Sequence, residues 1–434
     1  MKVFNRCRTI VFAILCIALF SSCKKEKSIA PVIRIMSPLP GQGFNAGDTV
    51  HVSASISDDH EVTSVTIRLL NASYISCDHD EVIRTTGSTA EIRKEYVISN
   101  SYLETGNYYI AVIASDGSEL TNEYVKIHIT ELPKVRKEVF LLSAYNNFSY
   151  TVSSLDSLNN PVMAFHVNGD YVSSAINSVN HELLTVGSIS GSFSAYDLFT
   201  NSIRWSYPPT AFSIPTFKNL FLIKDRVYVS YYDGRIKGYD MDGAQKYEVQ
   251  QQGYFIPDVI YKNDIYFFSE IYYRSSHMNK LGVFYLGTGE EKQEHTIDID
   301  LRNMYSLDQN RLLLFGNDTI LGQGKIEIYD ISGNGSILLQ TLLTGLLNNV
   351  VQLDDIHYLL ACTDGIYKYD YSMNSIITFV TGLPVYSLEY DEVNQELFAC
   401  SGHTMHVYNA VTATPEYTVT SADSLLDVKV LYNK

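Results

Sequence analysis

Gly191-Ser-Phe-Ser-Ala-Tyr-Asp197 returns, with changes, as Gly234-Arg-Ile-Lys-Gly-Tyr-Asp240 and as Gly324-Lys-Ile-Glu-Ile-Tyr-Asp330. A shorter copy is Gly365-Ile-Tyr-Lys-Tyr-Asp370, and degenerate copies are Leu281-Gly-Val-Phe-Tyr-Leu-Gly287 and Thr404-Met-His-Val-Tyr-Asn409. Each of the four full copies is a short alternating segment between a glycine and a Tyr-Asp pair, which predicts a strand followed by a turn. The chain from about residue 138 onward is therefore a series of repeats.

The spacing of these repeats predicts their architecture. The markers Tyr196, Tyr239, Tyr285, Tyr329, Tyr369 and Tyr408 lie 43, 46, 44, 40 and 39 residues apart, and a further copy ends at Leu155-Asp156. Seven units of this length, each with several short strands, are typical of propeller blades. We expect a seven-bladed β-propeller over residues 138–434, with the marker tyrosines in the blade cores. A surplus strand, Leu426-Asp-Val-Lys-Val-Leu-Tyr432, is expected to pair into the first blade and close the ring.

A separate all-β domain is predicted before the repeats, over residues 31–132. Alternating apolar segments there predict six strands, at 32–36, 49–57, 62–70, 91–98, 107–115 and 123–130. About 100 residues with six or seven strands fit an immunoglobulin-like (Ig-like) β-sandwich. The segments Pro31-Val-Ile-Arg-Ile, Gly47-Asp-Thr-Val and Tyr109-Ile-Ala-Val-Ile-Ala-Ser-Asp resemble those of bacterial Ig-like domains.

One repeat carries a longer motif. Ala195-Tyr-Asp-Leu-Phe-Thr-Asn-Ser-Ile-Arg-Trp205 resembles the Ala-x-Asp-x-x-Thr-Gly-x-x-x-Trp motif of quinoprotein-like (PQQ-repeat) propellers, with Asn201 in place of the glycine. The resemblance implies that Asp197 and Thr200 tie the turn between the outer strands and that Trp205 packs between blades. Asp240, Asp330 and Asp370 are the corresponding aspartates of other repeats. No residues can be assigned to the metal and quinone roles of those enzymes, so we expect no cofactor.

The first thirty residues predict export and a lipid anchor. Three basic residues precede an apolar run of 11 residues, Ile10 to Phe20, which suits a signal peptide and is too short for a stable membrane span. Ser21, Ser22 and Cys23 resemble the cleavage box of bacterial lipoproteins. The resemblance implies a signal peptide at 1–22, lipidation of Cys23 and a tether at 23–30. Tripeptides such as Asp48-Thr-Val and Asp156-Ser-Leu resemble the O-glycosylation sites of exported Bacteroidota proteins, which implies a Bacteroidota-like source. We expect an outer-membrane lipoprotein that faces either the periplasm or the cell surface.

Composition narrows the function. The chain has 434 residues, is 46% hydrophobic and carries a formal charge of −16, which predicts folded domains and argues against a nucleic-acid partner.

Cys362 and Cys400 occupy equivalent positions in adjacent repeats, so we expect two buried thiols too far apart for a disulfide. The acidic loop clusters at 58–60 and 77–80 match no complete calcium loop, and we expect no metal. We find no catalytic motif, so the sequence leans against enzymatic activity.

The leading hypothesis is a non-enzymatic propeller at the cell envelope that binds a protein partner. The alternative is a glycan-binding protein, or an enzyme that processes a polysaccharide or sugar in the propeller channel. Tyrosines are unusually frequent, with 33 copies against one tryptophan. Six of them fall outside the repeat pattern and are candidates for a binding platform: Tyr231, Tyr232, Tyr254, Tyr261, Tyr272 and Tyr273.

Overall fold

The computed structural model describes residues 29–434 except 147, 211–212, 225, 251–254 and 343–344. These residues form 36 strands and no helix, so the protein is all-β as predicted. Accordingly, the described part of the chain offers no helix of the length and apolar character needed to cross a membrane. The chain divides into two compact units after Pro133, and each is described by itself.

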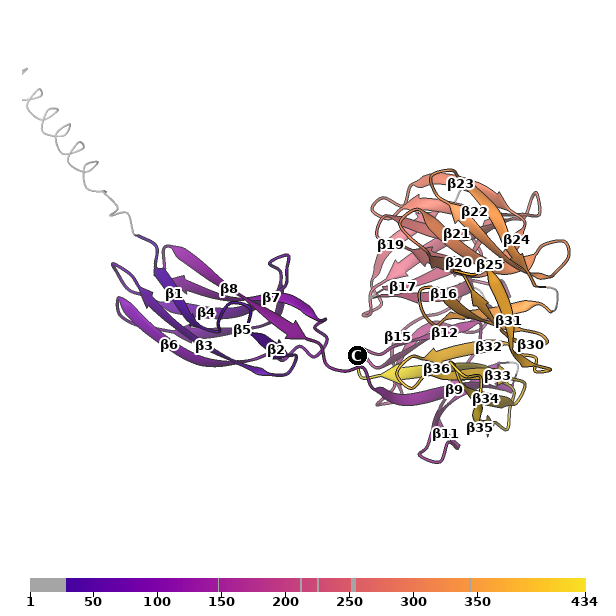
Figure 1. Ribbon diagram of the computed structural model, residues 1–434, viewed down its shortest axis with the longest axis horizontal. Helices are drawn as coiled ribbons and strands as arrows, with labels where there is room; N and C mark the ends of the chain where they lie inside the picture. The colour runs from indigo at the N-terminus through magenta and orange to yellow at the C-terminus, as the bar shows by residue number, and fades with distance from the viewer. Residues whose placement is uncertain (1–28, 147, 211–212, 225, 251–254, 343–344) are drawn as a thin grey trace, which may run out of the picture. The chain divides into compact units, whose positions relative to one another are not determined.

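The N-terminal unit is an Ig-like sandwich of two sheets (Figure 1). The three-stranded sheet has the order β1-β3-β6, and the five-stranded sheet has the order β2-β8-β7-β4-β5. All neighbours pair antiparallel except β2 and β8, which are parallel. The strand bounds are β1 (Val32–Ser37), β2 (Gly43–Asn45), β3 (Thr49–Ser57), β4 (Ser64–Leu70), β5 (Ser76–Arg84), β6 (Thr89–Val97), β7 (Gly106–Ser115) and β8 (Leu120–Thr130).

Alternation of apolar residues explains the sandwich core. Val50, Val52, Ala54 and Ile56 of β3 all point inward and are at most 2% exposed. Two strands were absent from the sequence prediction, β2 and β5. Strand β5 lies at a sheet edge and is largely polar and half-exposed, so it lacks the apolar alternation by which a strand is recognised.

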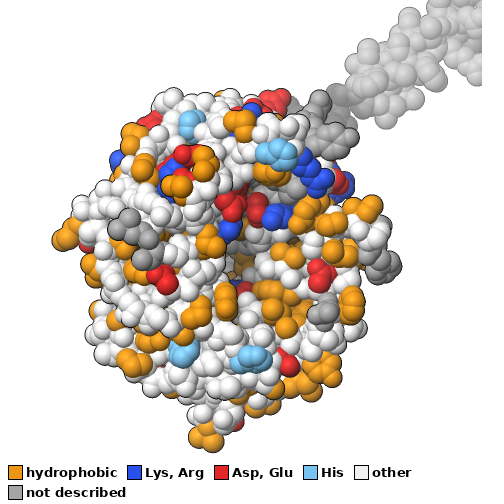
Figure 2. All heavy atoms as spheres, turned by 90° about the vertical axis from the view of Figure 1, so that its right-hand side faces the viewer, with side chains coloured by type: hydrophobic (Ala, Val, Ile, Leu, Met, Phe, Trp, Pro, Cys, Tyr) orange, Lys and Arg blue, Asp and Glu red, His pale blue; other side chains and the backbone are white. Residues whose placement is uncertain are grey.

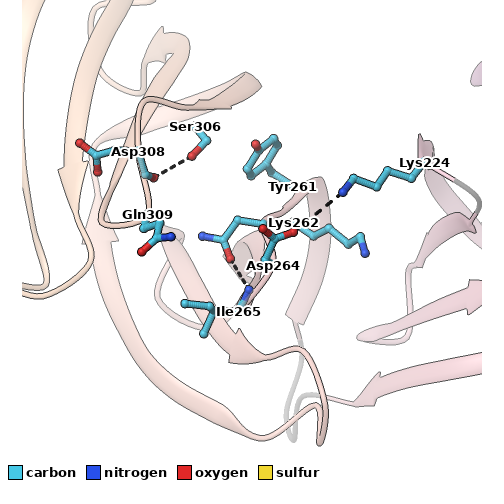
Figure 3. A pocket seen from close by; sticks show the side chains of 9 residues that line it. Lys224, Tyr261, Lys262, Asp264, Ile265, Ser306, Asp308 and Gln309 are labelled. Carbon is cyan, nitrogen blue, oxygen red and sulfur yellow. Dashed lines mark hydrogen bonds and ion pairs between the residues drawn. The ribbon is translucent and has the colours of Figure 1, made fainter. Parts of the chain in front are cut away.

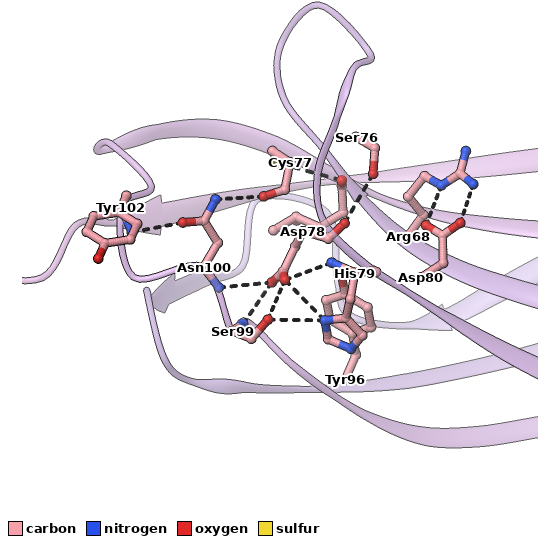
Figure 4. Close-up of polar contacts among 11 residues, drawn as sticks. Arg68, Ser76, Cys77, Asp78, His79, Asp80, Tyr96, Ser99, Asn100 and Tyr102 are labelled. Carbon is pink, nitrogen blue, oxygen red and sulfur yellow. Dashed lines mark hydrogen bonds and ion pairs between the residues drawn. The ribbon is translucent and has the colours of Figure 1, made fainter. Parts of the chain in front are cut away.

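The predicted loop at 77–80 is therefore part of strand β5, and its side chains tie this edge strand to its neighbours (Figure 4). The Asp78 carboxylate accepts hydrogen bonds from the backbone N–H groups of His79 (2.8 Å) and Ser99 (2.7 Å). Burial opposes its ionisation, but these bonds and those from the Ser99 and His79 side chains lower the pKa of Asp78. Asp80 forms an ion pair with Arg68 of β4. The cluster thus has a structural role.

The C-terminal unit is a propeller of seven four-stranded sheets, whose strands are given from the innermost outward. Blade 1 has β36 (Leu425–Tyr432), β9 (Arg136–Asn146), β10 (Ser149–Leu155) and β11 (Pro161–Asn168). Blade 2 has β12 (Ser173–Asn177), β13 (Glu182–Val186), β14 (Phe193–Asp197) and β15 (Ser202–Tyr207). Blade 3 has β16 (Phe217–Ile223), β17 (Arg226–Tyr231), β18 (Arg235–Tyr239) and β19 (Gln245–Gln250).

The remaining four blades follow in chain order. Blade 4 has β20 (Phe255–Lys262), β21 (Tyr266–Tyr273), β22 (Met278–Tyr285) and β23 (Glu291–Ile297). Blade 5 has β24 (Ile299–Ser306), β25 (Arg311–Asp318), β26 (Gly324–Asp330) and β27 (Gly335–Thr341). Blade 6 has β28 (Leu347–Gln352), β29 (His357–Cys362), β30 (Gly365–Asp370) and β31 (Ser375–Thr381). Blade 7 has β32 (Ser387–Asp391), β33 (Glu396–Ser401), β34 (Thr404–Asn409) and β35 (Pro415–Thr420).

The ring closes as predicted. Strand β36 pairs antiparallel with β9, so the C-terminal segment supplies the innermost strand of blade 1 (Figure 1). Each innermost strand contacts the innermost strands of the two neighbouring blades, including β36 with β32 and β12. Through this pairing blade 1 gains the same four-stranded sheet as the other blades, and the inner edge of β9 is covered.

The marker tyrosines pack in the blade cores with one correction. Tyr196, Tyr239, Tyr329, Tyr369 and Tyr408 are at most 8% exposed, whereas Tyr285 is 43% exposed. In blade 4 the register places Phe284, opposite Phe267, at the marker position, and Tyr285 takes the place of the aspartate. The extra aromatic residue in this repeat made the marker ambiguous by one position. Cys362 and Cys400 are buried free thiols, as predicted.

The aspartate after the marker holds the turn between the two outer strands. Asp197 Oδ1 accepts hydrogen bonds from the N–H groups of Phe199 (3.0 Å) and Thr200 (2.8 Å). Asp240, Asp330 and Asp370 accept equivalent bonds from Ala244, Gly333 and Met373. One residue of each turn is left-handed, and in blades 1 to 7 these are Asn159, Asn201, Gly243, Gly289, Asn334, Asn374 and Ala413. Asn201 thus adopts the conformation in which asparagine replaces glycine at low cost.

Trp205 joins blade 2 to blade 3. Its Nε1 donates a hydrogen bond to the carbonyl oxygen of Met241 (2.9 Å), in the outer turn of blade 3. Its ring packs edge-on against Phe193 and lies against Gly243, at which a Cβ atom would come within 2.8 Å of the indole. The Trp205 side chain therefore occupies the space between two blades.

Candidate binding site on one propeller face

The innermost strands begin on one face of the propeller, which we call the channel-mouth face (Figure 2). This face is hollowed at its centre, and acidic and basic side chains gather at the rim of the hollow. The central cavity has a volume of about 340 Å³ and is lined by residues of all seven innermost strands or the turns that lead into them. It is therefore the mouth of the propeller channel.

A buried aspartate organises one side of this mouth. Asp427 of β36 accepts hydrogen bonds from Tyr171 (2.7 Å) and Ser387 (2.6 Å) and forms an ion pair with Lys429 (2.8 Å). Burial opposes the ionisation of Asp427, but the charge of Lys429 lowers its pKa. Because Tyr171 precedes blade 2 and Ser387 belongs to blade 7, Asp427 connects both neighbours to the strand that closes the ring.

A second cavity, of about 280 Å³, lies beside the mouth between blades 3, 4 and 5, and we call it the side cavity. Its residues come from one strand of blade 3, three strands of blade 4, one strand of blade 5 and one turn. They are Lys218, Tyr232, Asp258, Glu270, Tyr272, Asn279 and Asp300. Asp258 is shared with the channel mouth, so the two cavities adjoin.

Glu270 is the most buried charged group of the side cavity. It is 2% exposed, and its Oε1 accepts hydrogen bonds from Asn279 Nδ2 (3.0 Å) and from the N–H of Leu301 (3.1 Å). Its Oε2 is buried without a hydrogen-bond partner among the described residues. Burial raises the pKa of Glu270 well above its ordinary value, and the charges of Asp258 and Asp300 raise it further.

The two aspartates of the side cavity are engaged in ion pairs. Asp258 lies 2.9 Å from Lys218 Nζ, and it also accepts a hydrogen bond from Asn219 (2.9 Å). Asp300 lies 2.9 Å from Arg302. Glu270 has no such cation within 4 Å among the described residues, which distinguishes it from both aspartates.

A third cavity continues outward on the same face. It has a volume of about 270 Å³ and is lined by Tyr232, Asp233, Arg274 and the segment 214–216, among others. Tyr232 is shared with the side cavity. The three cavities therefore adjoin one another in a series from the channel mouth toward the outer strands, and together we call them the groove.

Of the six tyrosines predicted as a platform, the five that the structure describes do not form one surface. Tyr232 and Tyr272 line the side cavity, and the Tyr272 hydroxyl contacts His277 (2.8 Å). Tyr231 is buried, with its hydroxyl bonded to that of Tyr239, which corrects its assignment to a surface. Tyr273 is half-buried against Lys280 and Glu294. Tyr254 lies outside the described residues.

Tyr261 lies in a cavity of about 370 Å³ where the innermost strands end, on the face opposite the channel mouth (Figure 3). Lys224 Nζ lies 3.9 Å from Asp264 Oδ1 in this cavity, and both side chains are largely exposed. The remaining contacts hold the turns themselves, such as the bond from the Ser306 hydroxyl to the Asp308 carbonyl (2.8 Å). This cavity therefore holds no buried charged group among its described residues.

The described residues contain one group of potential metal ligands, Asp58, Asp59 and His60, in the turn after β3. His60 Nδ1 contacts Asp59 Oδ1 (3.0 Å), and the His60 N–H donates to Asp58 Oδ1 (2.7 Å). These contacts are typical of an exposed Asp-rich turn. Cys23, the predicted site of lipidation, lies outside the described residues.

The sequence analysis did not single out the acidic and basic residues of the side cavity. A signal was present, because Glu270 is the one charged residue of the largely apolar strand Tyr266-Phe-Phe-Ser-Glu-Ile-Tyr-Tyr273. A carboxylate within a strand that is buried on both faces is costly and needs a partner or a role. That criterion would have selected Glu270 but not its neighbours, which come from other strands.

The seven sheets define a seven-bladed β-propeller protein with an N-terminal Ig-like domain. Within that domain, residues 31–112 match the family model described as Bacterial Ig domain. A search of curated proteins gave no match.

Solved structures similar to this chain have low sequence identity. The computationally designed Ika8 protein is 13% identical, with 69% of this chain and 98% of that chain covered and a TM-score of 0.47. The WD40 domain of Neurospora crassa Pan2 is 8% identical, with 60% and 82% covered and a TM-score of 0.47. A chain of the Mitotic Checkpoint Complex is 11% identical, with 59% and 79% covered and a TM-score of 0.47. The propeller assignment rests on the strand pairing itself.

Proposed function

We propose that this protein is a membrane-tethered interaction protein whose propeller binds a protein partner at the channel-mouth face. The observation that carries the proposal is the groove formed by three adjoining cavities on that face. A concave site that combines apolar walls with a few convergent polar groups is the usual form of a binding site. The propeller would act as a rigid support for it.

Exposed apolar side chains on the channel-mouth face support a protein partner. They belong to the turns of the channel-mouth face and are each at least 43% exposed: Phe148, Ile189, Ile214, Ile320, Leu321, Leu346 and Tyr386. Aromatic side chains are enriched in protein interfaces relative to the rest of the surface, and the buried core of an interface is more apolar than its rim. The formal charge of −16 favours a partner with a basic surface.

The membrane tether rests on the sequence around Cys23. Lipidation there would leave the Ig-like domain between the acyl chains and the propeller. We propose the outer membrane as its location, and the periplasmic and surface orientations are both compatible with this arrangement. Labelling of cells with a palmitate analogue should modify the protein and spare the Cys23→Ala variant.

The sugar-processing alternative is not favoured. Catalysis on glycosidic bonds uses a pair of carboxylates on either side of the substrate. In the channel mouth and the side cavity, Asp427, Asp258 and Asp300 each form an ion pair with a lysine or an arginine. Their ion pairs fit a role in holding strands and charges in place.

The test is a pull-down from detergent-solubilised envelopes with the full-length tagged protein, read by quantitative mass spectrometry. The channel-mouth variant is Ile320→Glu with Tyr386→Glu. The matched control, Phe199→Glu with Met373→Glu, replaces side chains that are 75% and 76% exposed on the opposite face.

We expect the wild-type protein and the control to retain one partner in near-equal amounts, and the channel-mouth variant to lose at least 90% of it. Equal loss from both variants would refute the assignment of the face. Failure of the wild-type protein to retain any protein above background would refute the interaction function.

A further inference from the structure

We propose that the side cavity binds a primary ammonium group, supplied by a lysine side chain of the protein partner. This inference rests on the proposed function and identifies the chemistry of the same face. It is carried by the buried, unpartnered Oε2 of Glu270 in a cavity that two further carboxylates share.

The size of the side cavity suits one long side chain. Its volume of about 280 Å³ lies just below the ~300–1,000 Å³ typical of sites for whole small molecules. Tyr232 and Tyr272 line it and provide aromatic faces of the kind that attract cations. The aliphatic part of a lysine could pack on these rings while its ammonium reaches the carboxylates.

The charges around Glu270 favour a positive guest. The titratable groups that line the cavity or act on Glu270 come from four strands and one turn, and they are Lys218, Tyr232, Asp258, Tyr272, Asp300 and Arg302. Asp258 and Asp300 both disfavour the ionised form of Glu270, and Arg302 only partly offsets them. The potential that opposes an anion at this position attracts a cation. Lys218 is neutralised by Asp258 at 2.9 Å.

Proton exchange accompanies binding in this scheme. Glu270 is protonated in the empty cavity below its raised pKa, and an ammonium group binds its ionised form. Binding therefore releases one proton, and affinity rises up to about tenfold for each pH unit until the pKa is passed. A hydroxyl guest, such as a sugar, gains no affinity from ionisation of Glu270 and shows no such rise.

The test measures binding of small probes to the full-length protein by calorimetry between pH 5.5 and 9. The probes are Nα-acetyl-lysine amide, its norleucine analogue without the ammonium, putrescine and methyl glucoside. The variants are Glu270→Gln and the matched control Glu182→Gln. Glu182 is also buried with an unpartnered Oε2, but it lies in blade 2 outside the cavity.

We expect the lysine amide to bind at least tenfold more tightly than the norleucine amide, with an affinity that rises with pH. Glu270→Gln should weaken lysine binding at least tenfold and remove the pH dependence, and Glu182→Gln should change neither. If Glu270→Gln does not fold, the norleucine comparison and the pH series on the wild-type protein still test whether the side cavity binds an ammonium group.

Several results would overturn the assignment. Equal binding of lysine and norleucine, binding of methyl glucoside instead, or no binding of the lysine amide would each exclude an ammonium site. Tighter binding of putrescine than of lysine would assign the cavity to a free diamine. The proposed function is judged separately, because the pull-down can succeed when the lysine probe fails.

Discussion

Replacement of Gly243 by alanine should loosen the contact between blades 2 and 3. Gly243 has φ +82°, and a Cβ there would lie 2.8 Å from the ring of Trp205. The left-handed conformation costs an alanine about 1–2 kcal/mol, of which about 0.4–1 kcal/mol is recovered from the unfolded state. Overpacking against the indole adds about 1–3 kcal/mol. We expect the free energy of unfolding to fall by about 2–3 kcal/mol.

Trp205 itself provides the assay, because it is the one tryptophan of the 434-residue chain. Excitation at about 295 nm selects it over the tyrosines, and urea unfolding followed by its emission gives the stability of the propeller. The native emission of Gly243→Ala should also shift to longer wavelength as the ring is displaced from between the blades.

The matched control is Gly402→Ala. Gly402 has φ +58°, and a Cβ added there would meet no atom within 4 Å, so only the backbone cost of about 1 kcal/mol or less applies. If Gly243→Ala is no less stable than Gly402→Ala and its native emission is unchanged, the packing of Trp205 against this turn is not what stabilises the contact.

Three further predictions concern buried groups. The folded state raises the pKa of Glu270 above its ordinary value of 4.5, so the free energy of unfolding falls as pH rises through the raised pKa. Glu270→Gln should therefore be more stable than wild type at pH 8 but not at pH 4, as urea unfolding at the two pH values would show. Asp427→Asn should cost about 3 kcal/mol by leaving Lys429 poorly paired, whereas Asp423→Asn should change stability by less than about 0.5 kcal/mol. Cys362 and Cys400 are buried, and burial raises the pKa of Cys362 to about 12. Iodoacetamide at pH 8 should therefore label both thiols only in urea, as peptide mass spectrometry would show. Labelling of either thiol in the native protein would contradict the buried blade positions.

The fold was predictable because its units repeat. A strand next to a Tyr-Asp turn appears at nearly constant spacing, and each copy must bury the same side chain against its own sheet. The period identifies a propeller even where single copies are degenerate. It fails only locally, as in blade 4, where adjacent aromatic residues shift the apparent marker from Phe284 to Tyr285.

The candidate site was not predictable in the same way. Lys218, Asp258, Glu270 and Asp300 lie on four strands of three blades, and only the packing of these adjacent blades brings them together. Residues that recur in every repeat belong to the blade core, whereas a binding site is formed by residues that do not recur. Strand β5 escaped prediction for a related reason, because polar edge strands lack a periodic apolar face.

The pairing of β36 with β9 also fixes the time at which the propeller can form. Blade 1 lacks its innermost strand until residues 425–432 have been synthesised, after all six other blades. Until then the edge of β9 is unpaired and open to other strands, which is a risk for aggregation. Closure is thus a late and strongly non-local step, and a truncation that removes β36 would leave the edge of β9 permanently unpaired.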